Sequence, residues 1–184
     1  METATTKMNT RDMTYIAVFT ALLAICSWIS VPTPTGIPVT FQTLGIFLTM
    51  GVLGGRRGTL AILSYLLLGA IGVPVLAGFS GGISAYISPS GGYLIGFLFT
   101  ALLMWGMEIL FGRRLPVLGV GMVLGMAAYY VFGTVWFLLV YARTESAVGL
   151  VTVLGWCVFP YLIPDCIKLF MALTLSGELR KHVR

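Results

Sequence analysis

The sequence predicts an all-α integral membrane protein of six transmembrane helices, organised as a single membrane-embedded domain over residues 1–184. Its hydrophobic residues make up 58% of the chain and its charged residues 9%, and the mean hydropathy is +0.99. A soluble fold of this length cannot hide so much apolar surface, whereas lipid accepts it. The apolar residues also fall in long runs that the few charged residues separate.

Five apolar runs can be placed in order along the chain. A spanning helix needs about 20 mostly apolar residues. The first run, residues 13–31, has an apolar core that is too long for a cleaved signal peptide. The second, residues 41–54, is short, so we expect it to be tilted or kinked or to start within the preceding loop; Arg56 and Arg57 close it. The next three runs cover residues 59–73, 93–111 and 115–142.

The sixth span ends near Glu178 and has two prolines close to its start. Proline fits the first turn of a helix and disrupts later turns. We therefore expect the span to begin near Pro160 or Pro164 and to hold Asp165 in its first turn, where the helix dipole favours a carboxylate. Residues 146–158 need not cross the membrane and are expected to pack as a short segment across the outer face.

The basic residues fix the orientation of the chain. Alternating the runs across a membrane puts nine of the eleven on one side, namely Lys7, Arg11, Arg56, Arg57, Arg113, Arg114, Arg180, Lys181 and Arg184. By the positive-inside rule this side is cytoplasmic, so both termini are inside and residues 32–40 and 74–92 face outward. This bias accounts for the net charge of +5 without a nucleic-acid partner; membrane lipid is the expected surrounding.

Two outer segments are uncharged and carry possible ligand-binding groups. Glycine, proline and serine break any helix across residues 69–93, which is typical of a lid or pocket wall. Three prolines keep residues 32–43 extended. We expect Gln42 and Thr43 to bring an amide and a hydroxyl to a pocket, or else to cap the helix or bond a neighbouring helix. Aromatic residues are expected to wall an apolar cleft: Phe41, Phe79, Tyr86 and Tyr93.

Asp165 and Lys168 are the most informative side chains within a span. Their spacing of three puts both on one helix face. At ~1.5 Å per residue above Arg180 they lie about 22 and 18 Å from the inner boundary, in the outer half of a ~30 Å core. Ionisable groups there line a cavity or pair with each other, so the alternative is a pair that only neutralises itself. Glu108, near the cytoplasmic end, is expected to turn toward Arg113.

Several function classes lack support in the sequence. There is no G-x-x-x-x-G-K-[ST] phosphate loop. No nucleophile and base are arranged for catalysis, so we expect no enzyme activity. Cys26, Cys157 and Cys166 have no metal-binding spacing, and no cofactor is expected. A self-contained channel or secondary transporter remains an alternative, but it would need charged residues along a path through both membrane halves.

Four segments together resemble BioY, the biotin-specific S component of energy-coupling-factor (ECF) vitamin transporters. They are residues 37–43, 69–82, 89–97 and 164–168, and the similarity extends over nearly the whole chain. Ser88 and Ser90 depart from a common glycine and threonine but remain small. The resemblance implies an ECF S-component-like fold of six helices that binds biotin from outside, in the cell membrane of a prokaryote. Another vitamin, or a precursor such as dethiobiotin, is the alternative ligand.

The resemblance also implies roles for particular residues. Asp165 can accept a hydrogen bond from a ureido N–H of biotin, and Lys168 can donate to the ureido carbonyl. The biotin carboxylate is expected near glycine amides of the outer segments, namely those of Gly81, Gly82, Gly91 and Gly92, although the two ends of the ligand could be reversed. The implied partners are a transmembrane coupling (T) protein and two cytoplasmic ATPases. Ala17 and Ala21 supply the small-residue spacing expected at the T-protein interface, and the alternative is packing within the chain.

Overall fold

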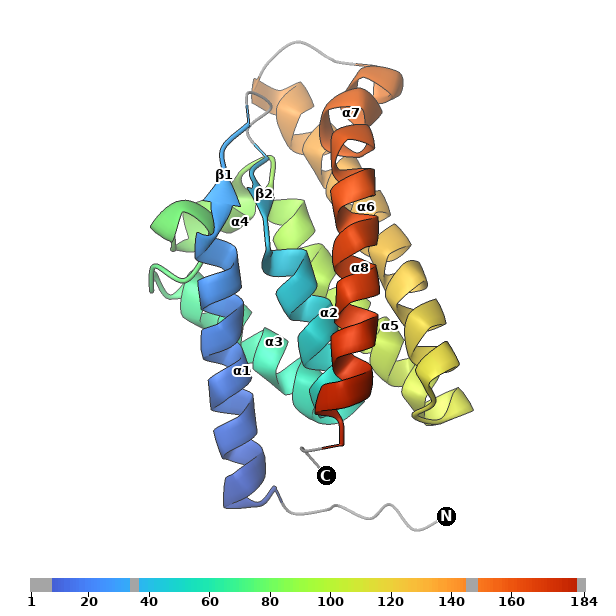
Figure 1. The fold of residues 1–184 in the computed structure, drawn as a ribbon. Helices are drawn as coiled ribbons and strands as arrows, with labels where there is room; N and C mark the ends of the chain where they lie inside the picture. The colour runs from blue at the N-terminus through green and yellow to red at the C-terminus, as the bar shows by residue number, and fades with distance from the viewer. Residues whose placement is uncertain (1–7, 34–36, 145–148, 182–184) are drawn as a thin grey trace.

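A computed structural model describes residues 8–33, 37–144 and 149–181, and it is a bundle of long helices (Figure 1). The bundle consists of α1 (Thr10–Trp28), α2 (Gln42–Leu53), α3 (Gly55–Ala70), α5 (Gly91–Phe111), α6 (Leu115–Thr144) and α8 (Phe159–Leu179). Short elements gather at the end where α1 finishes: β1 (Ser30–Val31), β2 (Val39–Thr40), η1 (Ala77–Phe79), α4 (Ile83–Ile87) and α7 (Leu150–Cys157). The start of α1 and the end of α8 lie at the opposite end.

The helices pack in a fixed order around the core. α5 and α6 form the most extensive contact, α2 packs against both α8 and α3, and α1 packs on α3 and α2. Gly54 reverses the chain between α2 and α3 with a φ of 82°, a conformation that favours glycine. At the other end, β1 and β2 pair antiparallel, with Ser30 opposite Thr40. The segment that follows α1 is thereby held against the start of α2.

The surface of the bundle is that of a multi-pass membrane protein. Within the described ranges, three helices are long and apolar enough to cross a membrane: α5, α6 over Leu115–Ala142, and α8. Their outward faces carry large apolar side chains that are 66–76% exposed, among them Ile109, Leu110, Val131, Ile163 and Phe170. Such contiguous apolar surface is stable in contact with lipid. α1, α3 and α2 are shorter or less apolar, with 19, 16 and 12 residues.

The last helix begins beside Pro160, one of the two expected positions, but Asp165 lies deeper in the helix than expected. α8 begins at Phe159, with Pro160 in its first turn and Pro164 inside the helix. Asp165 therefore lies in the second turn, and the prediction that the first-turn helix dipole stabilises it is wrong. Because Pro164 has no N–H, it also leaves the Pro160 carbonyl without its helical donor. α7 has eight residues, or about 12 Å of helix, so the described part of residues 146–158 is too short to cross a membrane.

Apart from Lys168, the basic residues whose side chains the structure describes lie at the end opposite α7. The Arg113 guanidinium donates to the Val52 carbonyl at 2.5 Å, at the end of α2, and Arg180 donates to the Arg113 carbonyl at 2.7 Å. Glu108 lies 4.0 Å from Arg113 and accepts from the Gly55 N–H at 2.8 Å, so it does turn toward Arg113. Arg56 and Arg57 belong to the first turn of α3 instead of closing α2. Lys7, the Arg143 side chain and Arg184 lie outside the described residues.

Candidate functional site

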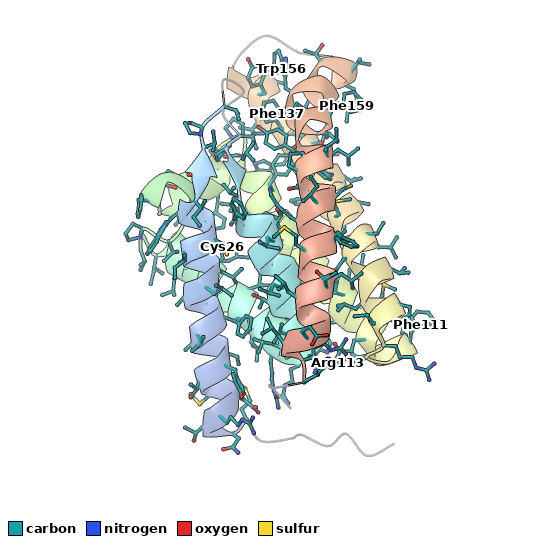
Figure 2. The ribbon with its side chains drawn as sticks, in the orientation of Figure 1. Cys26, Phe111, Arg113, Phe137, Trp156 and Phe159 are labelled. Atoms are coloured by element: carbon teal, nitrogen blue, oxygen red, sulfur yellow. The ribbon has the colours of Figure 1, made fainter. Side chains whose placement is uncertain are left out.

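A cavity of about 410 Å³ lies among the loop that leads into α2, residues 76–90, and helices α5, α6 and α8. The loop that leads into α2 and residues 76–90 lie toward the end of the bundle away from Arg113, the end at which Figure 2 labels Trp156 and Phe159. Asp165 and Lys168 are the charged members of the described lining, and they come from α8. Leu76, Leu94 and Phe97 give the cavity an apolar wall.

The Asp165 carboxylate is the centre of the polar part of this cavity. Its residue is 4% exposed. Oδ1 accepts from Lys168 Nζ at 2.8 Å and from Thr43 Oγ1 at 3.0 Å. Oδ2 accepts from the hydroxyls of Tyr129 at 2.5 Å and Tyr130 at 2.8 Å. A carboxylate offers about four acceptor sites, so the side chains of α2, α6 and α8 saturate it.

Lys168 retains bonding capacity toward the cavity. The ammonium donates to Asp165 Oδ1 at 2.8 Å and to the Thr40 carbonyl at 2.7 Å. These contacts use two of its three N–H donors, and Lys168 lines the cavity with only 7% of its surface exposed. The third donor can therefore reach a ligand acceptor. Because Thr40 is the last residue of the first outer loop (residues 32–40), Lys168 also links that loop to α8.

Gln42 ends a chain of hydrogen bonds that runs from the cavity toward α1. Its Nε2 donates to the Tyr65 hydroxyl at 2.8 Å, and that hydroxyl donates to Ser27 Oγ at 3.0 Å. All three residues are buried. The bond to Tyr65 fixes the amide plane and leaves the carbonyl oxygen of Gln42 as an acceptor at the cavity wall.

Tyr161 of α8 contacts the described residues on both sides of 34–36 in the first outer loop. The Tyr161 hydroxyl donates to the Ile37 carbonyl and lies 3.1 Å from Thr33 Oγ1. Thr33 in turn donates to the Ile37 carbonyl at 2.7 Å. Ile37, Pro38 and Tyr161 all line the cavity. The loop therefore forms part of the wall.

The structure divides the predicted site residues into two groups. Six contribute to the cavity lining: Gln42, Thr43, Gly81, Tyr93, Asp165 and Lys168. The other six are not part of that lining: Phe41, Phe79, Gly82, Tyr86, Gly91 and Gly92. The roles of all twelve residues in ligand binding stay predictions.

Four residues of the second group make local contacts and do not line the cavity. Phe79 is 64% exposed and stacks on Trp28, and the Tyr86 hydroxyl donates to the Leu66 carbonyl at 2.6 Å. The N–H groups of Gly82 and Gly91 already donate to backbone carbonyls of residues 69 and 88, at 2.7 and 2.9 Å. They are therefore not free to bind a carboxylate in this structure.

Several lining residues were not predicted from the sequence. The most consequential are Tyr129 and Tyr130, because both donate to Asp165. They lie in the middle of a long apolar run, where adjacent tyrosines are indistinguishable from core or lipid-facing residues until the helix faces are known. Serines of residues 80–90 form another part of the lining: Ser80, Ser84, Ser88 and Ser90.

Ala17 and Ala21 lie in a separate apolar groove between α1 and α3. It has a volume of about 800 Å³ and also includes Ile16, Ile25 and Leu60. Both alanines are exposed. The groove is on the outside of the bundle, so a second helix could approach α1 closely there.

Comparison with known proteins agrees with this architecture. The BioY family model matches residues 1–184. The chain belongs to the BioY family. A crystal structure of the S-component for biotin from an ECF-type ABC transporter superposes with a TM-score of 0.79, at 29% identity and over 95% of each chain.

Individual BioY proteins are similar over different lengths. The probable biotin transporter BioY of Pyrococcus horikoshii is 32% identical over 173 residues, which are 94% of this chain and 98% of that protein. The biotin transporter BioY of Rhodobacter capsulatus is 40% identical over 71% of this chain and 70% of its own length. The Thermotoga maritima BioY is 45% identical over 91 residues, so the match spans about half of each chain (50% and 53%).

Proposed function

We propose that this chain is the biotin-binding S component of an ECF-type ABC importer and captures biotin at the outer face for ATP-driven uptake. The observation that carries the proposal is the buried Asp165–Lys168 ion pair on the wall of the 410 Å³ cavity. Ionisable pairs within membrane helices mark ligand or ion sites, and small-ligand pockets occupy ~300–1,000 Å³. Membership of the BioY family and the named biotin transporters among its relatives support biotin as the ligand.

The proposed topology has six spans with cytoplasmic termini. The spans are α1, α2, α3, α5, α6 and α8. Their alternating directions bring Arg56, Arg113 and Arg180 to one end, as the positive-inside rule requires for a cytoplasmic face. The cavity then opens outward. The membrane is the cell membrane of a prokaryote, as the bacterial and archaeal sources of the relatives support.

The cavity chemistry suits the ureido ring of biotin. Its carbonyl can accept from the third N–H of Lys168, while a ureido N–H can donate to the Gln42 carbonyl oxygen. Asp165 can accept from the ligand only in place of one of its four present donors. A ligand carboxylate beside Lys168 would be repelled by the negative charge of Asp165. We therefore orient the ureido ring toward α8 and the carboxylate toward residues 80–90.

Coupling to ATP hydrolysis requires partner proteins. We propose a transmembrane coupling protein that packs in the groove at Ala17 and Ala21, together with two cytoplasmic ATPases. Support comes from the exposed small residues along this groove and from the likeness to an S-component of an ECF-type transporter. Small residues allow helix backbones to approach closely within a membrane.

The direct test is to identify the ligand that the protein retains. The chain is purified in detergent from cells grown with biotin, and bound small molecules are released and analysed by mass spectrometry. Biotin at a stoichiometry near one, together with saturable binding of added biotin by titration calorimetry, is expected. Retention of a different vitamin, or no biotin binding by folded protein, would overturn the proposed ligand.

A further inference from the structure

Residues 77–87, here called the lid, have two chemically different faces. The lid comprises η1, α4 and the turn between them. Small and polar residues face the cavity, namely Ala77, Ser80, Gly81, Ser84 and Ala85. Large apolar residues face away from it: Phe79, Ile83 and Ile87 are 64%, 65% and 63% exposed. Ile83 and Ile87 are four residues apart and share one side of α4.

This arrangement is the reverse of what a lid in water requires. A water-facing lid places polar groups outside and apolar groups against the protein. Here the outward side is apolar, and residues 69–93 contain no charged residue. Ile71, at the end of α3, is also 75% exposed. Large apolar side chains exposed in this way fit lipid or another protein.

The depth of the lid favours lipid. The 19 residues of α1 span about 28 Å, close to the ~30 Å of a bilayer core. With Arg11 and Asp12 at one boundary, Trp28 lies at the other, where tryptophan is enriched. Trp28 stacks on Phe79 with ring centroids 5.1 Å apart and donates to the Pro74 carbonyl at 2.8 Å. Figure 1 shows α4 beside this end of α1, short of α7.

The lid is anchored so that its apolar side stays outward. The Tyr86 hydroxyl donates to the Leu66 carbonyl at 2.6 Å, and the Gly82 N–H donates to the Gly69 carbonyl at 2.7 Å. At the residue that follows the lid, Trp136 Nε1 donates to the Ser88 carbonyl at 3.1 Å. These bonds tie the lid to α3 and α6, and rotation of Ile83 and Ile87 toward the cavity would break them.

We propose that the lid lies in the interface of the outer leaflet and that Phe79, Ile83 and Ile87 contact lipid. Opening the lid withdraws these side chains from lipid, so the bilayer itself helps to hold the lid closed over the ligand. The placement of the lid depends only on the fold and its orientation, whereas this holding role rests on the proposed function.

Fluorescence quenching in nanodiscs tests the placement without any ligand. Single cysteines replace Phe79, Ile83 and Ile87 one at a time, in protein whose Cys26, Cys157 and Cys166 are changed to Ala, and each carries a bimane label. Phospholipids with a doxyl group near the headgroup should quench all three labels, and aqueous iodide should not. A label at Phe170→Cys is the lipid control and one at Gly149→Cys the aqueous control. Iodide quenching as strong as at Gly149→Cys would overturn the placement.

The holding role is tested by the dissociation rate of radiolabelled biotin from protein in nanodiscs. The triple variant Phe79→Ser, Ile83→Ser, Ile87→Ser should release biotin at least about tenfold faster, because three apolar side chains no longer favour lipid. The double variant Ile109→Ser, Leu110→Ser changes equally exposed residues of α5 near the other end and should release biotin like the wild type. Equal rates in the triple variant and this control would overturn the holding role. If the wild type binds no biotin, the proposed function fails while the quenching result still locates the lid.

Discussion

Lys168 Nζ and Asp165 Oδ1 are 2.8 Å apart on adjacent turns of α8, and both side chains are less than a tenth exposed. The same carboxylate accepts hydrogen bonds from Thr43, Tyr129 and Tyr130. Asp165 therefore holds α2, α6 and α8 together at the cavity and fixes the direction of the lysine. Its charge compensates the lysine charge inside the membrane, so neither residue can be removed without leaving the other uncompensated.

Replacing Asp165 by Asn should weaken biotin binding strongly. Loss of one partner from a buried, hydrogen-bonded charge pair costs ~2–5 kcal/mol, which is roughly 30-fold to several thousand-fold in affinity. Lys168→Ala should cause a loss of similar size. Titration calorimetry on the purified variants measures both effects.

The chain offers a matched control for this experiment. Lys181 and Glu178 form an ion pair with the same spacing and the same 2.8 Å distance, but both side chains are exposed. Glu178→Gln should leave affinity unchanged, since exposed pairs contribute only ~0–1 kcal/mol and this one is remote from the cavity. Near-native affinity in both Asp165→Asn and Lys168→Ala would show that the pair does not form the binding site.

Tyr130→Phe should reduce affinity by a smaller factor. The change removes a hydroxyl that donates to Asp165 Oδ2 at 2.8 Å, while Tyr129 continues to donate to the same oxygen. A hydrogen bond to a charged group contributes ~1.5–3 kcal/mol, and only the part that positions Asp165 and Lys168 for the ligand affects binding, so the loss of affinity should be at most roughly 10- to 150-fold. Tyr15→Phe, which alters an exposed hydroxyl near the basic end, should have no effect on calorimetric affinity. Equal affinities in the two variants would contradict a role for the Tyr130 hydroxyl.

The composition and the apolar runs were sufficient to predict a helical membrane protein and its central ion pair. Asp165 and Lys168 stand out because ionisable residues are rare within apolar runs, and a spacing of three makes contact possible on any helix. Gln42 and Thr43 were found by similar reasoning, as polar groups entering a span. In each case the prediction rested on the chemistry of one residue and on its position in an apolar run.

The partners of Asp165 depended on tertiary structure. Tyr129 and Tyr130 reach the carboxylate only because α6 packs near α8 with those residues turned inward. The orientation of the loop aromatics depended on local backbone geometry in the same way. Phe79, expected in the pocket wall, has a φ of +56° and points outward against Trp28. Composition alone does not show to which side of a loop such a side chain points.

Cysteine accessibility in intact cells should confirm the orientation of the bundle. In protein without native cysteines, Ser80→Cys should react with a membrane-impermeant thiol reagent, because residue 80 is exposed at the proposed outer end. Lys181→Cys, at the basic end, should react only after the cells are lysed. Biotin should slow labelling at Ser80→Cys, which lines the cavity. Labelling of Lys181→Cys from outside would invert the topology and place the cavity on the wrong side for uptake.

Ala21→Trp should separate ligand binding from energy coupling. Ala21 is exposed in the α1–α3 groove and is absent from the cavity lining, so a bulky side chain there blocks close helix approach without altering ligand contacts. Biotin affinity of the isolated protein should hardly change, while co-purification with the coupling protein and ATP-driven uptake should fall. Val18→Trp, on an exposed part of α1 outside the groove lining, should retain biotin affinity, co-purification with the coupling protein and uptake. Loss of binding with assembly retained would mean that Ala21 supports the fold and that the coupling protein packs elsewhere.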